Sequence, residues 1–132
     1  MKYKYLILGL ILLSAIVFFT FYPEQAIVGP HGGVVKSAEN YNIESTAPYP
    51  KIYTFLLDKK FEPVSNKGLF CEVRLFPPDG IPIDLQLKPS GADGFEIESS
   101  AMAYFSYRVT FNVAGKSVSA MFYNENAIVK RK

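Results

Sequence analysis

The sequence predicts an all-β domain, an antiparallel immunoglobulin-like β-sandwich of about seven strands, preceded by one N-terminal transmembrane helix. Two observations predict the sandwich. Beyond the first apolar segment, Gly, Pro, Asn or Asp interrupts the chain about every eight to twelve residues, which is typical of short strands joined by turns. No stretch there keeps a helical apolar period over several turns, so we expect strands only.

The predicted membrane helix occupies the first residues of the chain. An uncharged apolar run extends from Tyr5 to Tyr22, and as a helix it would be about 27 Å long, close to the thickness of the hydrocarbon core. The run ends in bulky aromatic residues, which favours an uncleaved signal anchor over a cleaved signal peptide. Lys2 and Lys4 keep the amino terminus in the cytoplasm, so the domain faces the periplasm or the extracellular side of the cell membrane.

Composition supports one extracytoplasmic domain. We expect residues 1–22 to form the anchor, 23–30 a linker, 31–125 the sandwich and 126–132 a basic tail. From residue 23 onward, 12 Lys and Arg balance 12 Asp and Glu, which argues against a nucleic-acid binder, because such a protein would show a basic face. The single cysteine excludes a disulfide within the chain.

The expected strands follow the apolar pattern of the domain. They are 34–36, 42–46, 51–58, 69–76, 81–88, 95–99, 104–113 and 117–123. The clearest pair is 69–76 with 81–88, because Pro77-Pro78-Asp79-Gly80 between them suits a turn. Strict alternation in the second strand predicts that one face is buried, and this face carries Ile81, Ile83, Leu85 and Leu87.

Enzyme chemistry has few candidate residues in this chain, and we expect no catalytic activity. There is one histidine, His31, and no nucleophile elbow. Cys71 falls on an apolar strand face and is expected to be an inert core thiol. Glu96 and Glu98 share a strand face, which could pair carboxylates for acid–base catalysis, but the solvated edge of a strand is by far the commoner explanation of such a pair.

A metal site is restricted in the same way. A closed zinc site needs four Cys or His ligands, and His31 and Cys71 are the only two such residues. A looser site remains open, built from His31 with help from Glu44, Met102 or Met121.

The most distinctive motif is GPHGG at residues 29–33, directly before the first strand. Two interpretations stay open. The glycines can serve only to turn the backbone sharply, with His31 exposed on the turn. Alternatively, the loop presents His31 as a ligand at the edge of a rigid scaffold.

Several segments together resemble a known family. They are GPHGGVV (29–35), Tyr41 with Ile43-Glu44, IYTFLLD (52–58), Pro63-Val64, ADGF (92–95) and GKSVSA (115–120). This pattern is similar to small exported HGG-motif β-sandwich domains associated with adaptor proteins of heavy-metal cation efflux systems. The resemblance implies that His31 and Glu44 contact a transition-metal cation, Cu or Zn, and that the partner is an efflux adaptor.

Two functions therefore remain. The first is a membrane-anchored extracytoplasmic binding or accessory domain in transition-metal handling or efflux. The alternative is a structural immunoglobulin-like module of the cell envelope that binds another envelope protein without metal. An adjacent efflux adaptor gene would favour the first function.

Overall fold

The computed structural model describes residues 27–78, 80–98, 104 and 106–124 of the 132-residue chain. The predicted anchor (1–22), the predicted basic tail (126–132) and Met102 lie outside these residues. Within the described ranges, no helix has the length and apolar character needed to cross a membrane.

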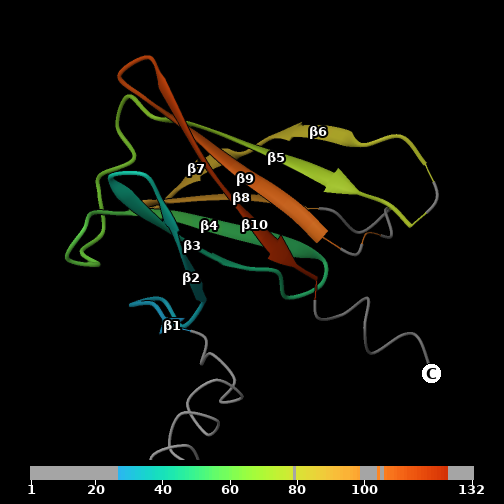
Figure 1. The fold of residues 1–132 in the computed structure, drawn as a ribbon, viewed down its shortest axis with the longest axis horizontal. Helices are drawn as coiled ribbons and strands as arrows, with labels where there is room; N and C mark the ends of the chain where they lie inside the picture. The colour runs from blue at the N-terminus through green and yellow to red at the C-terminus, as the bar shows by residue number, and fades with distance from the viewer. Residues whose placement is uncertain (1–26, 79, 99–103, 105, 125–132) are drawn as a thin grey trace, which may run out of the picture.

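The described part is all-β, as predicted, and its strands form two antiparallel sheets (Figure 1). The strands are β1 (Ile27–Val28), β2 (Val34–Ala38), β3 (Tyr41–Thr46), β4 (Lys51–Leu57), β5 (Phe70–Phe76), β6 (Ile83–Gln86), β7 (Lys88–Ser90), β8 (Gly94–Glu98), β9 (Ser106–Val113) and β10 (Lys116–Tyr123). The six-stranded sheet has the order β1-β2-β3-β4-β8-β7, and the four-stranded sheet has the order β10-β9-β5-β6.

The structure has ten strands in its described part, two more than the eight ranges expected from the sequence, for two reasons. Residues 27–28, inside the predicted linker, form β1 on the edge of β2. The predicted strand 81–88 is divided in two, because β6 pairs with β5 in one sheet and β7 pairs with β8 in the other. The chain changes sheets at Leu87, whose N–H donates to the carbonyl of Cys71 (3.0 Å).

The predicted buried face of 81–88 is only partly correct. Leu87 is buried and Ile83 and Leu85 are half-buried, but Ile81 is 84% exposed. Pairing with β5 starts at Ile83, opposite Leu75. Pro82 has no N–H to donate to a neighbouring strand, which explains why Ile81 stays outside the sheet.

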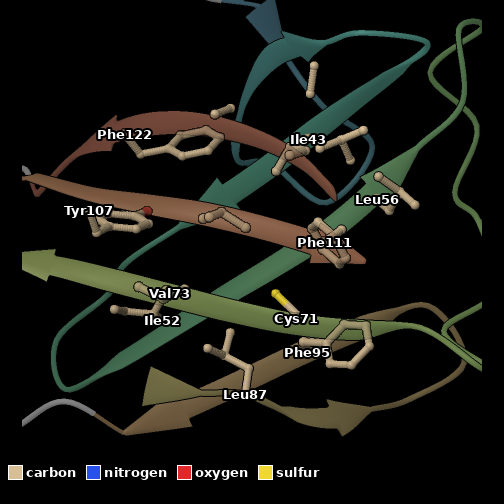
Figure 2. Close-up of a cluster of buried hydrophobic side chains, with 14 of the residues drawn as sticks. Ile43, Ile52, Leu56, Cys71, Val73, Leu87, Phe95, Tyr107, Phe111 and Phe122 are labelled. Atoms are coloured by element: carbon tan, nitrogen blue, oxygen red, sulfur yellow. The ribbon is translucent and has the colours of Figure 1, made fainter. Parts of the chain in front are cut away.

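The core lies between the two sheets, where side chains from both layers point toward one another (Figure 2). Its largest fully buried side chains include Tyr107, Phe95 and Phe111. Cys71 is buried among them, as predicted, and burial raises the pKa of its thiol to about 12. The thiol is therefore protonated and unreactive at neutral pH, which agrees with a packing role.

Candidate functional site

The HGG loop packs on the outer face of the six-stranded sheet. One row of register partners crosses four strands of this sheet, from Val35 through Glu44 and Phe55 to Gly94. Core residues such as Ile43 alternate with this row and face the other sheet. Glu44 and Phe55 therefore point away from the core, and the loop at residues 29–33 lies over them.

Glu44 is fully buried beneath this loop, with 0% of its side chain exposed. Its Oε2 accepts hydrogen bonds from the backbone N–H groups of His31 (2.9 Å) and Gly33 (2.8 Å). Its Oε1 lies 2.7 Å from Nδ1 of His31. A buried carboxylate is costly unless it is well hydrogen-bonded, and these three donors supply that compensation.

Each glycine of the motif is required for its own structural reason. A Cβ on Gly29 would lie 2.4 Å from Cδ of Glu44, and a Cβ on Gly33 would lie 2.8 Å from the carbonyl oxygen of Ser45. Gly32 has open space around it but a φ of 82°, a conformation that favours glycine. The loop can therefore approach the carboxylate closely only with glycines at these positions.

His31 links the buried carboxylate to the surface. Its ring is stacked on Phe55, with centroids 3.6 Å apart and planes 6° apart. Its Nε2 lies 2.8 Å from Oδ2 of Asp93, and the two side chains are 25% and 28% exposed. The imidazole is thus held between two carboxylates, Glu44 on the buried side and Asp93 on the exposed side.

The charges around His31 favour its protonated form. Burial on its own would lower the pKa of His31, but the hydrogen bonds and charges of Glu44 and Asp93 outweigh it and raise the pKa above its ordinary value of 6.5. The site therefore holds a proton more firmly than a free imidazole does.

The structure brings together the two residues that the resemblance implied, His31 and Glu44. It adds Asp93 and Phe55, which the sequence analysis did not identify as site residues. Asp93 was only part of the matching ADGF segment. Met121, the other candidate ligand, is not part of this site. It is exposed on β10 of the four-stranded sheet, in register with Arg108.

The other carboxylates considered for chemistry are at the surface. Glu96 forms an ion pair with Lys51 (3.1 Å), and Glu98 is exposed at the end of β8. The pKa of Glu96 is lowered, first by a hydrogen bond from Ser90 and then by Lys51, so it is poorly suited to act as a proton donor at neutral pH.

The site suits a metal only in part. Both oxygens of Glu44 already accept hydrogen bonds that fix the loop, so Glu44 can orient the imidazole better than it can bind a cation directly. Nε2 of His31 and the carboxylate of Asp93 remain as two ligand groups at the surface. Among the described residues, no group of three or more His, Cys, Asp or Glu is arranged to hold a metal ion.

Fold and site together define a β-sandwich domain with a histidine clamped between a buried and a partly exposed carboxylate. A comparison of the chain with protein-family models, with curated proteins and with solved structures finds no match. The arguments for function therefore come from the residues themselves.

Proposed function

We propose that this chain is a non-enzymatic binding domain, held on the outer side of a membrane by its N-terminal segment, that takes part in transition-metal handling through His31. The observation that carries the proposal is the hydrogen-bonded series Glu44–His31–Asp93, with distances of 2.7 and 2.8 Å. In metal sites, a ligating histidine commonly donates its other ring N–H to a carboxylate, which fixes the tautomer and makes the ligand more basic.

Each residue then has a distinct role. Glu44 accepts a hydrogen bond from Nδ1–H of His31 and so orients the ring, and Phe55 stacks on the face of the ring. On binding Cu or Zn, His31 releases its Nε2 proton and contributes Nε2, and Asp93 contributes a carboxylate oxygen. Glu44, expected from the resemblance to be a ligand, becomes a positioning residue in this proposal.

Two protein ligands leave most of the coordination shell to water or to donors from another protein. Such a site suits brief contact with a cation beside a transporter better than storage. Tethering to the membrane would compensate for weak affinity, because it raises the local concentration of the site near a membrane partner such as an efflux adaptor.

Calorimetric titration of the full chain in detergent with Zn²⁺ or Cu²⁺ tests the proposal. We expect saturable binding that Asp93→Asn weakens by at least about tenfold, because this change removes a ligand charge without touching the bonds between Glu44 and the loop. Asp84→Asn is the matched control, since Asp84 pairs with Arg74 on the other sheet and should bind like the parent. Absence of binding heat, or equal affinity for both variants, would contradict the proposal.

One observation favours the alternative function, an immunoglobulin-like interaction module without metal. Both ring nitrogens of His31 already lie within hydrogen-bond distance of carboxylates, which is sufficient to explain the motif as a clamp that fixes the loop. Under this alternative, cross-linking in membranes recovers the same envelope partner for the parent and for Asp93→Asn, with or without a chelator.

A further inference from the structure

A second candidate site lies on the outer face of the four-stranded sheet. A hollow of about 320 Å³ opens there, and residues from all four strands of the sheet, β10, β9, β5 and β6, line it. Six side chains line it on this face, namely Phe70, Glu72, Gln86, Thr110, Asn112 and Ser117, and the buried Cys71 also borders it. The hollow belongs to the sheet opposite the one that carries the HGG loop.

The strand register explains why these residues share one face. Asn112 of β9 is opposite both Phe70 of β5 and Ser117 of β10, and Glu72 is opposite both Thr110 and Gln86. The six side chains therefore form two adjacent rows across all four strands. The residues between them in sequence, such as Cys71 and Phe111, are buried in the core. A rigid two-sheet scaffold thus fixes the spacing of the lining groups.

The lining combines one aromatic ring, several uncharged hydrogen-bonding groups and one carboxylate, that of Glu72. Phe70 is 63% exposed, so its ring is open to a ligand on this face. Within the described part of the chain, neither the Glu72 carboxylate nor the Gln86 amide makes a hydrogen bond, while the Thr110 hydroxyl lies 2.8 Å from that of Ser119. Both open groups are available to a ligand.

We propose that this hollow binds a neutral saccharide of one or two pyranose rings. A pyranose has an apolar C–H face that packs on an aromatic ring, and a rim of hydroxyls that bond to amide, carboxylate and hydroxyl groups. The volume lies at the small end of the usual range for ligand pockets, about 300 to 1,000 Å³.

The lining disfavours other ligand classes. Glu72 is the single charged group among the lining residues, so an anion would be repelled. A fully apolar ligand would leave Glu72 and Gln86 without hydrogen bonds and out of water. A quaternary ammonium is usually held by several aromatic rings, and Phe70 is the one ring that lines the hollow.

Binding is tested by NMR on the labelled full chain in a detergent that contains no sugar. The probes are cellobiose and N,N′-diacetylchitobiose as free sugars, and cellulose and chitin for cosedimentation. We expect saturable shifts at residues of β5 and β9 with at least one free sugar, at an affinity near about 1 mM, as suits a shallow exposed site. Sedimentation with a polymer that Phe70→Ala reduces, without shifts from either disaccharide, would mean that the hollow holds one or two rings of an extended glycan and would also support the proposal.

Variants connect the binding to this hollow. Phe70→Ala and Gln86→Ala should each weaken it about tenfold, since each removes one aromatic or hydrogen-bonding contact. Phe70→Tyr keeps the ring and should bind like the parent.

Tyr123→Ala is the control for nonspecific stacking, because Tyr123 is a similarly exposed aromatic residue at the far end of β10. No binding to any probe, or equal loss in Tyr123→Ala and Phe70→Ala, would overturn the proposal. The site is independent of His31, so Asp93→Asn should bind sugar normally.

Discussion

The two outer faces of the sandwich differ in whether their polar side chains are hydrogen-bonded within the protein. On the six-stranded sheet, Glu44 and Asp93 are each hydrogen-bonded to His31, and Glu44 also accepts hydrogen bonds from the backbone of the HGG loop. On the four-stranded sheet, Glu72 and Gln86 line an open hollow instead. The first arrangement uses its hydrogen bonds for the stability of the domain, and the second leaves them for another molecule. Substitution of the buried Glu44 or of the glycines over it should therefore affect folding first, whereas substitutions in the hollow should affect binding with little effect on folding.

The largest loss of stability is expected from Glu44→Ala. This change removes the acceptor of two backbone N–H groups and of the His31 ring from a fully buried position. Donors left buried without partners, together with the lost charged hydrogen bonds, should lower the free energy of unfolding by about 3 kcal/mol. Urea denaturation followed by circular dichroism measures it.

The matched control is Glu62→Ala, since Glu62 is an exposed loop glutamate. We expect this variant to differ from the parent by less than about 0.5 kcal/mol. If the two variants were equally stable, the buried carboxylate would not hold the loop in solution.

The next effect is that of Gly29→Ala. The added Cβ would meet the Glu44 carboxylate at 2.4 to 2.8 Å, so either the loop or the carboxylate has to move. Overpacking of this kind should cost about 2 kcal/mol, measured by the same denaturation. In Gly80→Ala the nearest side-chain atoms are 3.9 Å away, so this variant should be nearly neutral. Similar stability of the two variants would show that the loop is loose over Glu44.

The sequence predicted the all-β fold because apolar alternation and turn residues are local signals. It missed the change of sheet at Leu87, since an alternating strand looks the same whether it pairs with one neighbour or with two in succession. It also missed β1, because the edge strand has only two exposed residues and no alternation to detect. These features depend on distant pairing partners, which the local pattern does not contain.

The residues of the candidate site could also be predicted only in part. The HGG motif indicated His31, and the resemblance added Glu44, thirteen positions away. Asp93 and Phe55 reach His31 only because β4 and β8 are neighbours in the sheet. Nor did the sequence reveal that Glu44 is buried, since a glutamate in a strand is ordinarily solvated. Its burial follows from the loop above it.

A smaller effect is expected in the pH dependence of stability. His31 is the single histidine, so its ring signals in an NMR titration are unambiguous. We expect a pKa above 6.5 in the parent, and a lower pKa in Asp93→Asn, which loses one of the two carboxylates.

The sign for stability follows by linkage. Because the folded pKa of His31 is raised, its contribution is fully present below the unfolded pKa, near 6.5, and is lost as pH rises through the folded pKa. The parent should therefore lose stability above about pH 6.5, and Asp93→Asn should lose less. Denaturation midpoints measured across this range check it. A folded pKa at or below 6.5 would mean that burial dominates over the carboxylates.

The smallest effect on folding is expected in the hollow itself. Gln86 is exposed on β6 and makes no hydrogen bond within the described part of the chain, so Gln86→Ala should change the free energy of unfolding by less than about 0.5 kcal/mol. The same substitution should weaken saccharide binding, which separates the two properties in one variant. If Gln86→Ala instead destabilised the domain by as much as Gly29→Ala, the polar groups of this face would serve the fold, and the contrast between the two faces would be lost.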